Sequence, residues 1–137
     1  MAVAGASNKE GKFGYLAYRE LKARGFTLCP VHPSSVTVDG DRCYAAVGDI
    51  PGTIDSLLVI LPPIQAETML KELDARRIRM VWLQQGAESI ESVRICLEKR
   101  IDVISGECIL MHAHPVRSYH LLHRWWRLAT CRLYGSR

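Results

Sequence analysis

The residues best suited to chemistry lie among the first fourteen positions. Gly5-Ala6-Ser7 ends a short apolar run, and two lysines and a glycine follow before a helical pattern begins. Small residues at a strand-to-helix turn let backbone N–H groups approach a phosphate, and the helix N-terminus adds a favourable dipole. The spacing of Gly5 and Gly11 does not match the G-x-G-x-x-G fingerprint of dinucleotide-binding folds. We therefore predict a phosphate-binding loop of another type, formed by Gly5, Ala6, Ser7, Lys9, Gly11 and Lys12.

The end of the second predicted strand bears on which nucleotide could bind. It reads Val31-His32-Pro33-Ser34-Ser35, with no acidic residue before Asp39. NAD-binding folds place Asp or Glu here to bind the ribose hydroxyls. A carboxylate would repel a further phosphate on the ribose, whereas His32 and two hydroxyls would tolerate one. The pattern disfavours NAD and leaves NADP open. The alternative role for His32 is that of a turn residue bonded to the backbone.

Two further strand ends carry candidate ligand contacts. Leu61-Pro62-Pro63 would form an apolar wall with few donors, although Pro63 is equally typical of the first residue of a helix. Gln84, Gln85 and Gly86 follow the next strand and are candidates for polar contacts, whereas Trp82 is better suited to the core. Ligands of doubly wound sheets bind beyond the carboxyl ends of the strands. We therefore expect four or five strand ends, counting the one near Gly106-Glu107-Cys108, to converge on one crevice.

Composition limits the class of protein. A length of 137 residues with 48% hydrophobic and 23% charged residues is typical of one globular domain. No apolar run is long enough to span a membrane and no secretory signal is predicted, so we expect a cytoplasmic location. The five cysteines lack motif spacing, which argues against a disulfide framework or a zinc site. A net charge of +4 suits a small polyanionic ligand but does not indicate nucleic acid.

Apolar segments alternate with helical patterns along the chain. Because continuous apolar strands alternating with helices are typical of parallel sheets, we predict a three-layer α/β, Rossmann-like, doubly wound, mainly parallel sheet with an added C-terminal helix. The third helix is expected to bury Ile90, Val93 and Leu97. The expected strands are 2–4, 26–31, 56–61, 80–83 and 102–105, and the expected helices are 14–24, 64–77, 89–99 and 118–133, with residues 34–53 loop-like apart from a brief strand near Tyr44.

Read together, these motifs resemble the small CoA-binding proteins, which are similar to the CoA-binding domain of the succinyl-CoA synthetase alpha subunit. The resemblance runs from about residue 2 to residue 111. Three features depart from the family pattern: His32 stands where Asn is usual, Glu107 precedes Cys108 where Asp-Arg is common, and the tail has no counterpart. The matching pieces are Gly5-Ala6-Ser7 with Lys9 and Gly11, Val31-His32-Pro33, Asp55 with Leu61-Pro62-Pro63, Val81-Trp82-Leu83-Gln84-Gln85-Gly86, and Cys108-Ile109-Leu110-Met111.

The resemblance implies a non-catalytic protein that binds CoA or an acyl-CoA at the carboxyl ends of the strands. No nucleophile, base and orienting group can be assembled from the sequence, so no catalytic residue is assigned. The alternatives are an NAD(P)-binding, oxidoreductase-like protein, with NADP as the other cofactor, and a regulatory protein that senses CoA through a partner.

The segment after Met111 contains several histidines and a pattern typical of an amphipathic helix. Its histidines, with His112 and His114 two apart, lack supporting ligands, which disfavours a metal site. We divide the chain into a CoA-binding domain over residues 1–111 and a helical extension over 112–137 packed on that domain. In residues 118–133 the apolar positions fall near one helical face, which could serve a homodimer or a protein partner. These positions are Leu121, Leu122, Trp125, Leu128 and Ala129.

Overall fold

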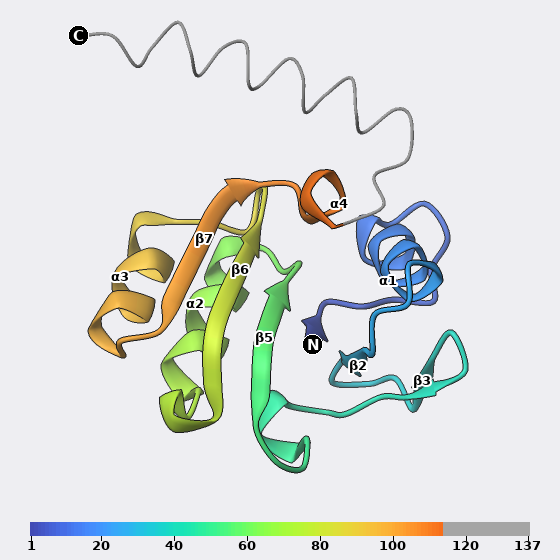
Figure 1. Ribbon diagram of the computed structural model, residues 1–137, viewed down its shortest axis with the longest axis horizontal. Helices are drawn as coiled ribbons and strands as arrows, with labels where there is room; N and C mark the ends of the chain where they lie inside the picture. The colour runs from blue at the N-terminus through green and yellow to red at the C-terminus, as the bar shows by residue number, and fades with distance from the viewer. Residues whose placement is uncertain (114–137) are drawn as a thin grey trace, which may run out of the picture.

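The computed structural model describes residues 1–113 (Figure 1). The predicted helix 118–133, and with it the proposed packing of the extension, lies outside the described residues. No helix among the described residues is long and apolar enough to cross a membrane.

A five-stranded parallel sheet forms the centre of the fold, in the order β2-β1-β5-β6-β7. The first strand has neighbours on both sides, since Val3 is in register with Pro30 of β2 and with Leu58 of β5. The chain first crosses from β1 to β2 on one side and later adds β5, β6 and β7 on the other side. This reversal of strand order next to β1 is the switch point of a doubly wound sheet. The strands are β1 (Ala2–Ala4), β2 (Cys29–Val31), β5 (Ile54–Val59), β6 (Ile78–Gln84) and β7 (Asp102–Glu107).

Helices cover both faces of the sheet, which gives the three layers that the sequence predicts. Helices α2 (Pro63–Glu72) and α3 (Ile90–Glu98) lie on one face, while α1 (Phe13–Ala23) and the single turn α4 (Ile109–His112) lie on the other (Figure 1). Successive strand residues alternate between two cores, so Leu57 packs with α2 and α3 while Leu58 packs with α1 and α4. The strands read as continuous apolar runs because both faces are buried.

The backbone at Gly5 passes between two other backbone segments. A Cβ at Gly5 would lie 2.3 Å from the carbonyl oxygen of Ile60, and the residue has a φ of +91°. A Cβ at Gly14, in the first turn of α1, would lie 2.1 Å from the carbonyl oxygen of Gly5. Both positions need glycine, because a side chain would push α1 and β5 away from the end of β1.

Several element boundaries differ from the predicted ones. Strand β2 starts at Cys29 rather than at residue 26, because Phe26 N–H still bonds to the carbonyl of Leu21 at the end of α1. Strand β5 covers Ile54–Val59 instead of 56–61, since Leu61-Pro62 already belongs to the turn into α2. The predicted helix 64–77 ends at Glu72, and the short 3-10 helix η2 (Ala75–Arg77) follows it.

The predicted buried stripe of α3 is wrong at Ile90 and Leu97, whereas Val93 is half-buried against the core. Ile90 and Leu97 are 92% and 63% exposed, and the helix buries Ser92, Ile95 and Cys96 instead. The reason is the N-terminal cap: the Ser89 hydroxyl accepts from Ser92 N–H at 2.9 Å and donates to Glu67 of α2 at 2.6 Å. The bond to Glu67 holds the start of α3 against α2. In this orientation the helix directs Ser92, Ile95 and Cys96 to the core, and Ile90 and Leu97 to the outside.

A β-hairpin lies within the segment predicted as a loop. Strands β3 (Thr37–Val38) and β4 (Asp41–Arg42) are antiparallel, and both turn residues, Asp39 and Gly40, have positive φ. An Asp-Gly pair between short strands is a strong hairpin signal that the loop-like reading overlooked. Nearby, the brief strand expected around Tyr44 is a single parallel bridge to Val31.

Helix α1 holds the hairpin by a small polar network. The Tyr18 hydroxyl donates to Asp41 at 2.7 Å, and Lys22 Nζ lies 2.8 Å from the same carboxylate oxygen. Lys22, followed by the Tyr18 hydroxyl, holds the pKa of Asp41 below its usual range. Burial, followed by the bond to Asp41, raises the pKa of Tyr18, so its hydroxyl stays a neutral donor.

We expect Gly14→Ala to destabilise the fold by about 1–3 kcal/mol, because the added methyl group overpacks a backbone contact that cannot move aside. This cost outweighs the better helix propensity of alanine. The control is Gly48→Ala, whose Cβ would meet nothing within 4 Å and whose φ is not positive. It should be neutral or stabilise by about 0.4–1 kcal/mol. Urea unfolding of both variants measures the difference, and equal stabilities would contradict the proposed close contact.

Candidate ligand-binding site

A pocket of about 720 Å³ opens beside α2, on the face of the sheet that α2 and α3 cover. This volume lies within the range of small-molecule sites. The carboxyl ends of β1, β2 and β5 contribute to one end of the pocket through Gly5, His32 and Leu61. Its lining residues are Ala4, Gly5, Val31, His32, Pro33, Ala45, Ala46, Val47, Gly48, Ile54, Leu61, Ile64, Gln65, Thr68, Met69, Glu72, Leu73, Asp74, Arg77 and Ile78.

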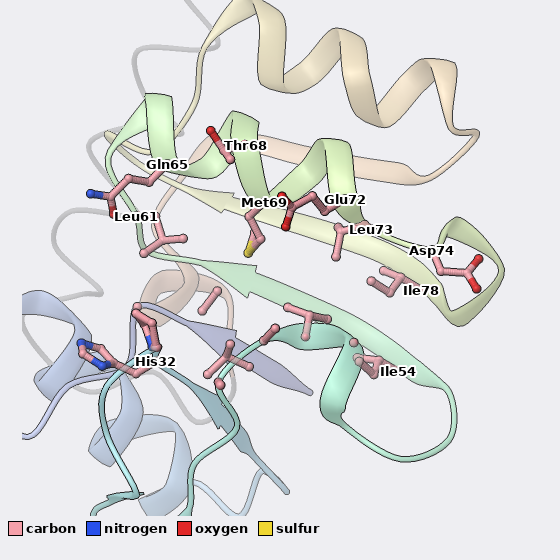
Figure 2. A pocket seen from close by; sticks show the side chains of 18 of the residues that line it. His32, Ile54, Leu61, Gln65, Thr68, Met69, Glu72, Leu73, Asp74 and Ile78 are labelled. Carbon is pink, nitrogen blue, oxygen red and sulfur yellow. The ribbon is translucent and has the colours of Figure 1, made fainter.

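The pocket is elongated and mainly apolar. Figure 2 shows Leu61, Met69 and Leu73 along one wall, with His32 at one end and Ile78 at the other. Residues 45–48 form part of the opposite wall, so the pocket lies between this segment and α2. Such a surface fits a flat or extended apolar group whose polar part remains at the end near His32.

His32 is held in place by its own turn. Its Nδ1 accepts from Ser34 N–H at 3.3 Å and lies 3.1 Å from the Ser35 hydroxyl, while its backbone N–H donates to Tyr44. Because Nδ1 accepts a backbone hydrogen, the neutral ring carries its hydrogen on Nε2. The turn-residue role is therefore present, and the ring still contributes to the lining of the pocket.

The predicted phosphate loop lies next to the mouth of the pocket and shares Gly5 with it. Helix α1 begins after Lys12 without a side-chain cap and has no acidic residue in its first turn. Lys9 and Lys12 are exposed on the loop. Backbone N–H groups at an uncapped helix start, with cations nearby, provide a favourable environment for an anion.

Asn8 fixes this loop to the β3–β4 hairpin. Its Nδ2 donates to the carbonyl of Thr37 at 2.8 Å, and its Oδ1 accepts from Asp39 N–H at 3.0 Å. Within the loop, the Ser7 hydroxyl accepts from Lys9 N–H at 3.0 Å. Asn8 was not among the predicted site residues, because its partners lie about thirty positions later in a hairpin that was not predicted.

The predicted site residues divide into two groups. Gly5, His32, Pro33 and Leu61 line the pocket. The side chain of Ala6 is fully buried, so at most its backbone could meet a ligand. The others lie outside the lining: Ser7, Lys9, Gly11 and Lys12 in the loop, Pro62 and Pro63 at the start of α2, and Gln84, Gln85 and Gly86 after β6.

The expectation that four or five strand ends converge on one crevice is only partly correct for this pocket. The ends of β1, β2 and β5 contribute to the lining, whereas those of β6 and β7 do not. Gln84 is 5% exposed, and its Oε1 accepts from Ile109 N–H at 3.0 Å, so this oxygen secures the start of α4. Gln85 and Gly86 are exposed beside it.

The region around α4 is a packed structural cluster. Trp82 is 8% exposed and its Nε1 donates to the Glu107 carbonyl at 3.0 Å, which confirms its predicted core role. His112 Nε2 lies 3.2 Å from a Glu107 carboxylate oxygen, and the centroids of the His112 and Trp82 rings are 5.4 Å apart. Among residues 1–113, no three His, Cys, Asp or Glu side chains gather as a metal site would require.

Sequence reasoning missed much of the pocket lining. Met69 of α2 and Leu73, directly after this helix, pack with the core and also line the pocket. Residues 45–48 and Arg77 carried no recognisable signal, because their place depends on contacts between distant segments.

Comparisons with known proteins show the family to which the chain belongs. The sequence model described as a CoA binding domain matches residues 1–114. The chain belongs to this CoA-binding family. The family supports coenzyme A as the ligand and gives no support to NADP.

Related proteins place this domain in two contexts. Over 83% of its length the chain is 28% identical to the alpha subunit of ADP-forming acetate–CoA ligase II from Pyrococcus furiosus, and it covers 28% of that subunit. It is 30% identical over 79 residues to the ADP-forming acetate–CoA ligase of Methanocaldococcus jannaschii, covering 58% of this chain and 11% of the ligase. The chain thus spans only a part of each ligase.

A solved structure shows the domain in a chain of similar size. A conserved hypothetical protein from Pyrococcus furiosus superposes with a TM-score of 0.75 at 30% identity, covering 79% of this chain and 93% of that one. The match supports the three-layer fold as the common unit of these proteins.

We expect Asn8→Ala to release the loop from the hairpin without unfolding the domain, because Asn8 is exposed and bonds only to backbone groups in the described contacts. Hydrogen exchange of the Asp39 amide should become faster, since its acceptor is lost. Asn8→Asp is the matched control: it keeps an acceptor for Asp39 N–H and loses the donor to Thr37. Unchanged exchange of the Asp39 amide in Asn8→Ala would show that the Asn8 hydrogen bonds do not hold the loop against the hairpin.

Proposed function

We propose that this chain binds coenzyme A or an acyl-CoA without transforming it. The observation that carries the proposal is the position of Gly5, which begins the predicted phosphate loop and also lines the apolar pocket. CoA combines phosphates with apolar parts, and a site for it needs both environments side by side.

The phosphates would lie at the Gly5–Lys12 loop. Backbone N–H groups at the start of α1 would donate to them, and Lys9 and Lys12 would supply charge. The fold supports this role because Gly5 and Gly14 bring the start of α1 directly against the end of β1.

An apolar part of CoA, either the adenine ring or the pantetheine arm, would enter the pocket beside α2. Leu61 and Met69 offer it apolar contact, and Gln65 and Thr68 lie near the same wall. The Thr68 hydroxyl already donates to the carbonyl of Ile64 at 3.0 Å, so it retains acceptor capacity.

The turn after β2 favours CoA over NAD. It presents His32, Ser34 and Ser35 where NAD-binding folds have an acidic residue. The 3′-phosphate of CoA can approach these groups without meeting a carboxylate on the turn, and His32 Nε2–H is available to donate.

No catalytic set is assembled in the pocket lining that residues 1–113 form, which is consistent with a binding role. No cysteine or serine is among the described residues that line the pocket. Cys108 is buried at the start of α4, and His112 is bonded to Glu107 rather than aligned with a nucleophile. The described lining therefore offers no serine or cysteine beside a base, the arrangement that most acyl-transfer enzymes use.

We expect CoA to bind at least about tenfold more tightly than NAD, a difference of about 1.4 kcal/mol or more. The physical reason is the lack of a ribose-binding acid together with the loop for phosphates. Calorimetric titration with CoA, acetyl-CoA, NAD and NADP measures the difference. Tighter binding of NAD, or steady consumption of acetyl-CoA by the protein alone, would overturn the proposed function.

We expect Lys9→Ala to weaken CoA binding by about 1–2 kcal/mol, the scale of a charge-assisted hydrogen bond. Lys71→Ala is the charge-matched control, because Lys71 is exposed near the end of α2 and does not line the pocket. Lys9 is a better probe than Gly5, whose replacement would clash with the backbone of Ile60. Equal CoA affinities in the two lysine variants would contradict the proposed binding of the phosphates at the Gly5–Lys12 loop.

A further inference from the structure

One wall of the pocket is held by an arginine that lies far from it in the sequence. We infer that Arg77 is a positioning residue that keeps residues 45–52 in the shape the ligand requires, and does not itself bind the ligand's phosphates. This inference rests on the proposed binding of CoA.

The side chain of Arg77 donates to three backbone carbonyls of one short segment. Its Nε bonds to Gly52 at 3.0 Å, its Nη1 to Gly48 at 2.9 Å, and its Nη2 to Gly52 at 2.8 Å. The same Nη2 also donates to the carbonyl of Ile50. A planar guanidinium presents five N–H donors in a fixed fork and can hold three carbonyls at once, whereas a lysine ammonium has three donors and reproduces only part of this geometry.

The segment that Arg77 holds has little regular structure of its own. It contains the single 3-10 turn η1 (Val47–Asp49), where Asp49 Oδ2 accepts from Ala46 N–H at 3.0 Å. Val47 and Ile50 are each 4% exposed and anchor the segment to the core. Arg77 adds a polar clamp at the outer side of these anchors, so the path of residues 45–48 along the pocket depends on it.

The position and bonding of Arg77 argue against a direct role in binding phosphate. Its guanidinium has five N–H donors, and four hydrogen bonds to carbonyls occupy most of them. It also lies just before the amino end of β6, whereas the phosphate loop follows the carboxyl end of β1. The two groups are at opposite ends of the sheet.

A second arginine provides a matched control on the other face. Arg24 Nη1 donates to the carbonyl of Leu110 at 3.1 Å and to that of Ala113, and its Nη2 lies 2.9 Å from Glu20. Its side chain is 3% exposed and it does not line the pocket. Arg24 therefore has similar clamping chemistry without contact with the ligand-binding wall.

The experiment compares Arg77→Gln, Arg77→Lys and Arg24→Gln with the unaltered full chain. Each is titrated with CoA at a temperature where circular dichroism shows it folded, and hydrogen exchange of the Asp49 and Ile50 amides is followed. These amides donate within η1, to Ala46 and Val47, and report directly on the wall.

We expect Arg77→Gln to lose CoA affinity by on the order of tenfold, because the ligand must then order the wall as it binds. Asp49 and Ile50 should exchange faster, and Arg77→Lys should recover part of both losses. Arg24→Gln should lower the unfolding midpoint while CoA affinity and the exchange of these two amides stay unchanged.

The outcomes separate the two proposals. If the unaltered chain binds CoA and Arg77→Gln binds it equally well, the positioning role is wrong. Equal losses of affinity in Arg77→Gln and Arg24→Gln would also overturn it, because they would reflect general destabilisation. If the unaltered chain does not bind CoA, the proposed function fails, while amide exchange still shows whether Arg77 holds the wall.

Discussion

The close approach of three backbone segments at Gly5 is the constraint on which the rest of the structure depends. Gly5 N–H donates to Val31 at 3.2 Å, and Ile60 N–H donates to Ala4 at 2.8 Å, so the ends of three strands are bonded at one place. Gly14 then lets α1 begin directly against the carbonyl of Gly5. As a result, the N-terminus of α1, the predicted phosphate loop and the mouth of the pocket share one small region of backbone.

Side-chain hydrogen bonds to backbone carbonyls position the segments that the sheet does not hold. Arg77 holds the pocket wall, Arg24 holds α4, and Lys99 Nζ donates to the carbonyls of Lys71 and Leu73 at 2.6 and 2.7 Å. Each clamp joins positions at least 25 residues apart. The pocket thus has one side formed by the sheet and α2, and a second side that is anchored by Val47 and Ile50 and held on the backbone by Arg77.

The fold class and the central strands could be predicted because burial on both faces demands continuous apolar runs, as in Leu57-Leu58-Val59. The rotation of α3 could not, because the cap at Ser89 and its bond to Glu67 outweigh the apolar pattern of Ile90 and Leu97. The hairpin at Asp39-Gly40 had a signal in its turn residues, yet its short strands lack the alternation that marks a longer hairpin.

The sequence by itself determined the alternation of strands and helices, the glycine-rich loop after β1 and the absence of an acid after β2, since all three depend on local residue types. Only the tertiary structure decided which strand ends meet at the pocket. Gln84 lies at a strand end, as predicted, but its side chain bonds to Ile109 in the core. Arg77 carries no local signal and nevertheless holds the segment that forms one wall of the pocket. Its partners are carbonyls more than twenty residues away, and only folding brings them within reach.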